Sequence, residues 1–197
     1  MTIRAPHGAV IGKPGLSEQA AQHFGDRGKA GTVGEVRTGA LLAKLAEVPG
    51  GPTVIHDLRI PIPGFRANID HAVISGREVT LVDSKLWKDG FYWTLGATRR
   101  GFTAAPYCDK KTLPTGVAGM MRAIHQMGVK VTFRRSVLVV WAPDQNRPPN
   151  LRFYRPQSAI AVAADASGRT LRRLSRLCGA APANPQVVSA VSKFLYV

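Results

Sequence analysis

Residues 67–85 decide how we expect the chain to fold, and they read ANIDHAVISGREVTLVDSK. Apolar side chains alternate with polar ones on both sides of a short polar segment, Ser75 to Glu78, which contains a glycine. Two alternating runs joined by such a segment are typical of a β-hairpin. The stretch therefore predicts two antiparallel strands, at residues 67–74 and 79–85.

This hairpin would place two carboxylates side by side. Side chains of a strand alternate between its faces, so Asp83 and Lys85 share a face with Leu81. If the hairpin turns on a two-residue loop of Gly76 and Arg77, Asp70 lies directly opposite Asp83. A loop that differs by one residue would make the two acids diagonal neighbours instead.

Two ionised carboxylates in this position need a compensating charge. At about 5 Å and an effective dielectric of about 20 they repel by roughly 3 kcal/mol, whereas a cross-strand pair usually contributes about 0.2 to 1 kcal/mol. A divalent cation offsets the repulsion, and Mg²⁺ is typically held by one or two protein carboxylates together with water and phosphate oxygens. We therefore expect Asp70 and Asp83 to bind Mg²⁺ or Mn²⁺, with Lys85 facing a phosphate or an attacking water. A structural ion pair of Asp70 with Lys85 is the alternative, and it leaves Asp83 unexplained.

The rest of the chain predicts helices on both sides of further strands. Thr32 and Glu35 have the spacing of a capping box, which would start a helix, and residues 49–52, Pro-Gly-Gly-Pro, would end it. The aromatic residues 90–101 could extend the strand meander, and a helix at 115–127 would then cross over to a parallel strand. The expected helices are 32–48, 115–127, 170–178 and 185–195, and the further strands are 54–60, 131–141 and an edge strand at 157–164.

This order of elements predicts an α/β fold with a mixed central β-sheet flanked by helices. Residues 1–30 are polar, rich in glycine and aperiodic, so we expect a flexible or partly helical N-terminal arm, with at most a short helix at 17–24. Residues 31–197 would form one domain. Met120, Met121 and Met127 are expected in the core.

The charge of the chain indicates a polyanionic partner. Lys and Arg number 27 against 12 Asp and Glu, a formal net charge of +15. Nucleic acid is the leading partner, and an anionic membrane surface comes second. On the predicted helix 170–178 four arginines recur at helical spacing and form either a phosphate-contacting stripe or a solvated face: Arg169, Arg172, Arg173 and Arg176.

The sequence gives no sign of secretion or membrane insertion. The apolar runs are far shorter than a membrane span, and the opening residues have no continuous apolar stretch. Cys108 and Cys178 form no metal-binding or disulfide pattern. We expect a cytoplasmic protein without a membrane partner, and the sequence leaves a homodimer open.

At this point the sequence resembles the nuclease-related domain, NERD, of the PD-(D/E)xK nuclease superfamily. The resemblance rests on residues 34–35 (Gly-Glu), 68–71 (Asn-Ile-Asp-His) and 82–85 (Val-Asp-Ser-Lys), and it continues through Trp87, Gly90 and Trp93. It implies a restriction-endonuclease-like core in which Asp70 and Asp83 bind metal, Lys85 is catalytic and Glu35 is a helix-borne acid that also serves the metal. Two features depart from the family: the acid at position 83 is more often Glu, and a Gln expected near the next helix start is not evident at residues 114–121.

These observations lead to one preferred function and two alternatives. We expect a Mg²⁺-dependent nuclease with the catalytic residues Glu35, Asp70, Asp83 and Lys85, and DNA as substrate follows from the resemblance alone. A non-catalytic nucleic-acid-binding module that keeps the fold is the nearest alternative, and a basic structural protein of a nucleoprotein particle is the third.

Several other side chains carry a structural and a functional interpretation. His56, His71 and His125 are expected to pack or to hydrogen-bond rather than to bind metal. Trp87, Tyr92 and Trp93 could stack on bases, but aromatic residues of a sheet protein more often lie in the core.

Overall fold

The central hairpin forms as its sequence predicts. The computed structural model describes residues 8–15, 26–108 and 111–196, with backbone alone for 26–30. Strands β3 (Asn68–Ser75) and β4 (Glu78–Leu86) pair antiparallel around Gly76, whose φ of 59° suits a tight hairpin turn. His71 lies opposite Val82, which is the register predicted from a Gly76-Arg77 loop. Asp70 and Asp83 stand one position beyond this last pair.

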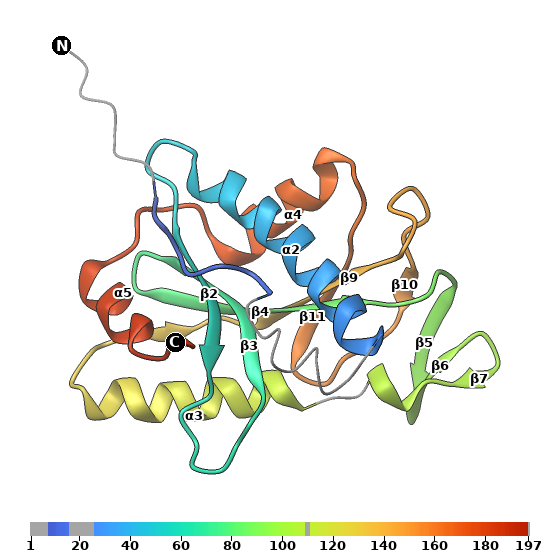
Figure 1. Cartoon of the computed structure of the whole chain (residues 1–197), viewed down its shortest axis with the longest axis horizontal. Coiled ribbons are helices and arrows are strands. Elements are labelled where there is room, and N and C mark those ends of the chain that lie inside the picture. The colour runs from blue at the N-terminus through green and yellow to red at the C-terminus, as the bar shows by residue number, and fades with distance from the viewer. Residues whose placement is uncertain (1–7, 16–25, 109–110, 197) are drawn as a thin grey trace.

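The hairpin is the middle of a seven-stranded mixed sheet (Figure 1). Its order is β1 (Val10–Ile11), β2 (Thr53–Arg59), β3, β4, β9 (Ser136–Trp141) and β11 (Ala159–Ala163), and β8 (Thr132–Phe133) also pairs with β4. Strands β2, β3 and β4 are antiparallel neighbours, whereas β9 runs parallel to β4 and β11 parallel to β9. The expected edge strand and the parallel crossover are both confirmed.

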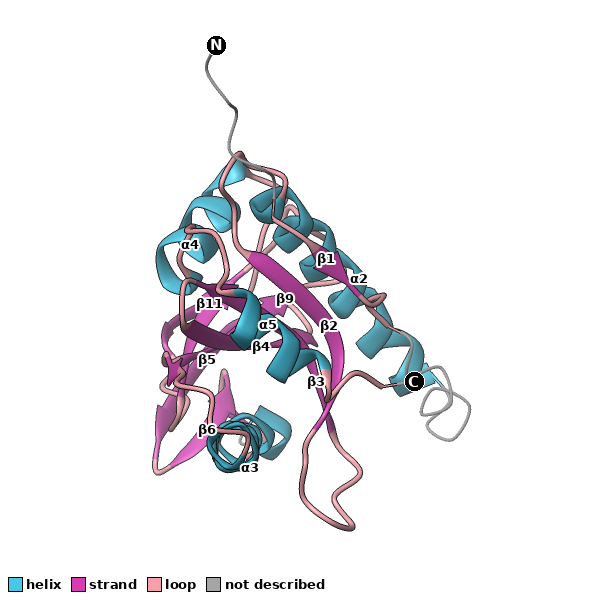
Figure 2. Cartoon of the chain, turned by 90° about the vertical axis from the view of Figure 1, so that its left-hand side faces the viewer, coloured by secondary structure: helices cyan, strands magenta, loops and turns pink. Residues whose placement is uncertain are grey.

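Helices cover both faces of this sheet, as Figure 2 shows for α2 and α4 on one side and α3 on the other. Helices α2 (Asp26–Ala46) and α4 (Gly168–Cys178) bury Leu42 and Leu174 in one apolar cluster. Helices α3 (Thr112–Gln126) and α5 (Pro185–Ser192) bury Met120 and Val187 in the other. The predicted α/β class, a mixed sheet flanked by helices, is therefore confirmed.

A second, small sheet lies at one end of the molecule. It consists of β10 (Asn150–Phe153), β5 (Phe91–Leu95), β6 (Ala97–Arg100) and β7 (Thr103–Ala104), followed by the short helix η1 (Pro106–Cys108). The expectation that residues 90–101 extend the central meander is thus wrong. Trp87 and Tyr92 pack together with ring centroids 5.0 Å apart and are buried, so this sheet is built on an aromatic core rather than on the edge of the central sheet.

The beginning of the first long helix differs from the prediction. Helix α2 starts at Asp26, so Thr32 lies inside it and the capping-box interpretation of Glu35 is wrong. The local sequence placed the start too late, because the helix extends six residues before Thr32 and so needs no cap there. Within the N-terminal arm, Val10 and Ile11 pair with β2, a strand that the polar composition did not predict. The short helix expected at 17–24 lies outside the described residues.

Two smaller expectations also need correction. Met120 is buried, but Met121 and Met127 are 48% and 37% exposed, because α3 turns only one narrow face to the sheet. His125 lies on the exposed side of α3, unlike the buried His56 and His71. In the part of the chain that the structure describes, no helix combines the length and apolarity that crossing a bilayer requires.

Candidate active site

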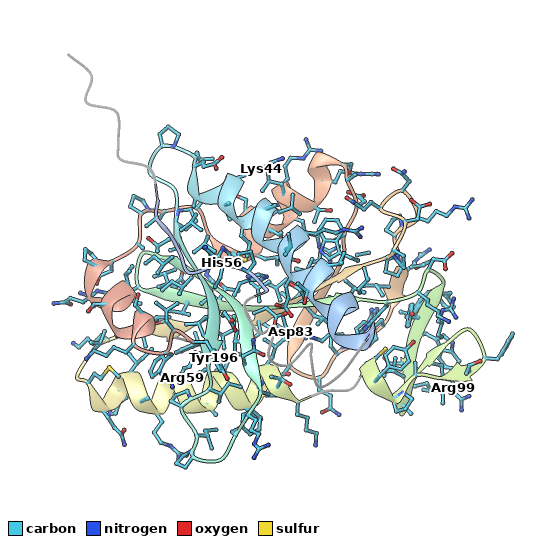
Figure 3. The ribbon with its side chains drawn as sticks, in the orientation of Figure 1. Lys44, His56, Arg59, Asp83, Arg99 and Tyr196 are labelled. Atoms are coloured by element: carbon cyan, nitrogen blue, oxygen red, sulfur yellow. The ribbon has the colours of Figure 1, made fainter. Side chains whose placement is uncertain are left out.

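The site forms where β3 and β4 pass beyond their last paired residues. Asp70 and Asp83 are each only 6% exposed, and Lys85 is half-buried beside them. Lys85 Nζ forms an ion pair with Asp83 Oδ2 and donates a hydrogen bond to the Ser84 carbonyl at 3.0 Å. The Ser84 N–H donates to Asp70 Oδ2 at 2.6 Å. Figure 3 shows Asp83 in the interior, between α2 and α3.

Burial and the neighbouring charges change the protonation of Asp70. Burial raises the pKa of Asp70 well above its ordinary value, and the negative charge of Asp83 raises it further, with only partial relief from Lys85. Burial alone would lower the pKa of Lys85, but the charges of Asp83 and Asp70 outweigh it and keep the ammonium protonated. The site is thus a buried acidic pair with one fixed cation.

Glu35 approaches this group from α2. Helix α2 comes close to β4 at Gly34, where an added Cβ would lie 3.3 Å from the Lys85 carbonyl carbon. The next residue is Glu35, whose pKa is raised by burial, lowered by Lys85 and raised again by Asp57 and Asp83. The absence of a side chain at position 34 therefore lets the helix carry its acid to the end of β4.

A pocket opens in front of Asp83 and Lys85. Its volume is about 280 Å³, and Trp87, Tyr107 and Tyr154 form part of its wall. Lys111 and Gln157 also line it, so it combines a cation and an amide with the carboxylate and the ammonium of β4. The pocket gives a substrate access to Asp83 and Lys85.

The comparison with protein families agrees with this geometry. The family model of the nuclease-related domain, NERD, matches residues 30–125. The match confirms the family resemblance that the sequence predicts for this part of the chain. The match includes the helix, hairpin and crossover helix that carry or surround Glu35, Asp70, Asp83 and Lys85. No curated protein and no solved structure matches the chain.

The matched region also contains an acid that the sequence alone did not reveal. Asp57 lies in β2, is 2% exposed and has a φ of 55°, which is uncommon for a residue other than glycine. Its Oδ1 accepts a hydrogen bond from Asn68 at 2.6 Å, whereas its Oδ2 is buried with no partner among the described residues. Burial raises the pKa of Asp57. The available signal was a charged residue between two buried neighbours in a strand, His56 and Leu58.

Behind the acids, three polar side chains form a buried chain on the opposite face of the hairpin. His56 Nδ1 and His71 Nδ1 lie 2.8 Å apart, and His71 Nε2 lies 3.1 Å from Ser84 Oγ. Burial lowers the pKa of both histidines, that of His56 to about 4, so both are neutral at physiological pH. The expected hydrogen-bonding role of His56 and His71 is confirmed, and it fixes Ser84, whose N–H contacts Asp70.

The carboxylates of this domain fit a magnesium ion in part. Among the described residues, no group of three or more His, Cys, Asp and Glu is arranged to hold a metal, so Glu35 is not gathered into one ligand set with Asp70 and Asp83. Asp70 and Asp83 nevertheless form a buried oxygen pair whose repulsion a cation relieves. Since Mg²⁺ usually takes one or two protein carboxylates, the pair fits this ion.

The arginines of the predicted stripe lie on α4 and are all exposed. Arg169 pairs with Asp165 at 3.6 Å, and Arg173 donates to the Ala161 carbonyl at 3.2 Å. Arg172 and Arg176 lie near Lys44 of α2, on the side of the sheet that α2 and α4 cover. Arg172 and Arg176 thus line a different part of the surface from the pocket at Asp83 and Lys85.

Proposed function

We propose that this nuclease-related domain hydrolyses phosphodiester bonds of DNA in a reaction that depends on Mg²⁺ or Mn²⁺. One observation carries the proposal: the buried pair Asp70 and Asp83 shares the end of the hairpin with a protonated Lys85, and the pocket opens there. A structural ion pair alone does not account for two buried carboxylates facing one ammonium. The net charge of +15 supports a polyanionic substrate.

Asp70 and Asp83 are the residues that would hold the metal, and Glu35 could reach it through water. When bound, such an ion polarises the scissile phosphate and lowers the pKa of water. Asp70 keeps its orientation because the Ser84 N–H holds Oδ2, and since no described residue bonds to Oδ1, that oxygen could serve as the ligand atom.

Lys85 and Glu35 would act on charge and protons. The Lys85 ammonium is held by Asp83 and the Ser84 carbonyl, so it can donate to the attacking water and stabilise charge that develops on the phosphate oxygens. Glu35 has a raised pKa and holds a proton more readily than an exposed glutamate, so it is suited to exchange one with water.

A cleavage assay tests this proposal. Purified protein is incubated with labelled linear, circular and single-stranded DNA in Mg²⁺, Mn²⁺ or EDTA. Lys85→Ala should reduce cleavage by about 10² or more while DNA binding stays close to wild type, because the ammonium acts mainly in the transition state. Lys85→Arg should be nearly as inactive, since its planar guanidinium places donors differently.

Metal binding is measured separately by calorimetric titration of Mn²⁺. Wild type should bind the ion, and Asp70→Ala should not. Equal binding by both proteins would remove the metal site, and wild-type cleavage by either Lys85 variant would overturn its assignment. DNA binding without cleavage in any metal would favour the non-catalytic module.

A further inference from the structure

A second pocket adjoins the one at the acidic pair. It has a volume of about 410 Å³, and four arginines line it: Arg135, Arg152, Arg155 and Arg173. We refer to it as the arginine pocket. Tyr154, Pro156 and Ala159 line both pockets, so the two are continuous around these residues.

The fold gathers these arginines from three separate segments, of which one carries both Arg152 and Arg155. Arg135 precedes β9, Arg152 lies in β10, Arg155 follows β10, and Arg173 lies on α4. Strands β10 and β11 contact each other, and Figure 1 shows α4 above β11. Because the segments are far apart in sequence, no helical or strand periodicity could have revealed the cluster.

None of the four is neutralised by an acid within the described part of the chain. Arg155 donates to the Arg152 carbonyl at 2.8 Å and Arg173 to the Ala161 carbonyl, which uses some of their N–H groups but leaves their charge unbalanced. The ion pairs formed by described residues involve Lys85 or other arginines, and no Asp or Glu lines the pocket. Four like charges around one concavity repel each other, and a bound anion relieves that repulsion.

Phosphate is the anion that this donor set suits. A guanidinium presents a planar fork of N–H donors that matches two phosphate oxygens, and several forks around a concave surface can hold successive phosphates. The neighbouring pocket supplies Asp83 and Lys85, whereas the charged residues of the arginine pocket are all arginines. Such a division separates the group that reacts from the groups that hold the strand.

We propose that the arginine pocket binds backbone phosphates of the nucleic acid strand whose scissile bond lies at Asp83 and Lys85. The inference rests on the proposed function for the position of that bond, but the phosphate binding itself does not. Only Arg173 of the α4 stripe takes part. Arg172 and Arg176, which lie on the other side of α4 beside Lys44, do not contact the strand.

The test compares two double variants that remove the same charge. Arg135→Ala with Arg152→Ala empties half of the arginine pocket, and Arg172→Ala with Arg176→Ala is the matched control on α4. All four side chains are exposed, so both variants should fold, which thermal melting checks. Binding of a labelled DNA strand of about 12 nucleotides, a length within the range covered by single-strand binding domains, is measured in EDTA at several NaCl concentrations, with an RNA of the same sequence in parallel.

The arginine-pocket variant should bind DNA at least about tenfold more weakly than the control. Its plot of log affinity against log salt should be flatter by about 0.7 for each phosphate of the single strand that the removed arginines neutralise, and the control should stay near wild type. Equal reductions in both variants, or a larger reduction in the control, would overturn the proposal. If the arginine-pocket variant bound RNA more weakly than the control does but bound DNA equally well, the phosphate site would stand and DNA would be contradicted as the substrate.

The same experiment separates phosphate binding from hydrolysis. EDTA prevents metal-dependent cleavage, so binding is read without catalysis. A specific reduction of binding in the arginine-pocket variant, together with a wild type that cleaves nothing, would support the phosphate site and refute the hydrolytic function. Metal-dependent cleavage by wild type, together with equal DNA binding by the arginine-pocket variant and the control, would support the hydrolytic function and refute the phosphate site.

Discussion

Asp57 is a buried carboxylate near the site, and only one of its two oxygens has a hydrogen-bond partner among the described residues. Its backbone is turned out of the β2 ladder between the pairs His56–His71 and Leu58–Ile69, and its carbonyl accepts a hydrogen bond from the N–H of Tyr196 at 2.9 Å. Figure 3 shows Tyr196 beside Arg59 at this end of β2. Its side chain has one bonded and one unbonded buried oxygen. Asp57 therefore costs stability when ionised, because burial penalises the charged form.

Asp57→Asn should increase stability, and the gain should grow with pH. Since the pKa of Asp57 is raised in the folded protein, the folded state holds more protons than the unfolded state as pH rises above the ordinary value. The contribution of Asp57 to the free energy of unfolding of wild type is thus fully present at low pH and is lost as the pH rises through the pKa of the folded state. Near pH 3 wild type and variant should be about equally stable, and near pH 7 the variant should be the more stable, measured by urea unfolding in EDTA.

Asp57→Ala is the control for this prediction. Asn tolerates a positive φ and can still accept from Asn68, whereas Ala at this φ costs about 1 to 2 kcal/mol. The Ala variant should therefore be less stable than the Asn variant at every pH. An Asn variant less stable than wild type at neutral pH would show that ionised Asp57 has a cationic partner.

At the level of single residues, the sequence was sufficient to predict the positions of the candidate site residues that lie in regular strands. Period two and a two-residue turn place Asp70, Asp83 and Lys85 together, and the register of β3 and β4 confirms that placement. The position of Asp57 near the site was not predicted, because its positive φ interrupts the alternation of the strand. The residue types around it do not indicate such an interruption. Gln157 and Lys111 enter the pocket from distant loops, which no local pattern encodes.

At the scale of elements, the contact of α2 with β4 determines where Glu35 lies. Gly34 faces the backbone of Lys85 and Leu86, with distances of 3.3 and 3.5 Å from an added Cβ to the nearest atoms of each. A methyl group at this position would meet backbone atoms, which cannot rotate away. Among the described residues, the only atom within 4 Å of a Cβ added at Gly31, one turn earlier in α2, is Glu35 Oε1 at 3.9 Å.

Gly34→Ala should reduce cleavage more than it reduces stability. The gain in helix propensity, up to about 1 kcal/mol, offsets the cost of moving α2 away from β4 by a few tenths of an ångström. The shift nevertheless displaces Glu35 from the acidic pair. Gly31→Ala, with the same propensity gain and no backbone contact, should raise stability by roughly 0.5 to 1 kcal/mol and leave cleavage near wild type.

Cleavage rates and the midpoints of urea unfolding, measured for both variants, test this prediction. Equal activities would show that the close approach at Gly34 does not position Glu35. The difference between the variants, rather than either value alone, isolates the helix-to-strand contact because both exchange a glycine of one helix for alanine.

Helices and strands were predicted correctly where the periodicity of their own residues determines the structure. The predictions failed where contacts with distant parts of the chain determine it. The β-hairpin, the crossover helix and the parallel β9 follow from alternation, helical spacing and a continuous apolar run. The aromatic segment after Trp87 forms its own sheet with β10, a partner more than 50 residues away, and that long-range pairing is invisible locally.

On the scale of the whole molecule, the charge is far from balanced. Twelve acids cannot pair with 27 lysines and arginines, and two of the acids that do pair lie in exposed, long contacts at Asp89 and Asp144. The compact state therefore carries a general repulsion, which salt screens over a Debye length of about 10 Å at 0.1 M. Binding of an anion to the folded state adds a second, site-specific stabilisation.

Salt should therefore raise the melting temperature in two separable ways. Raising NaCl from about 0.01 M to about 0.1 M should raise it for wild type and for both arginine double variants alike, because screening acts on all charges. Sodium sulfate at equal ionic strength should raise it further, partly through its exclusion from protein surfaces, which is common to the three proteins, and partly through occupancy of the arginine pocket. The pocket contribution should be missing only in Arg135→Ala with Arg152→Ala. Differential scanning fluorimetry measures all three proteins side by side, and an equal sulfate increment in each would show that general exclusion accounts for the effect and that the arginine pocket holds no tetrahedral anion.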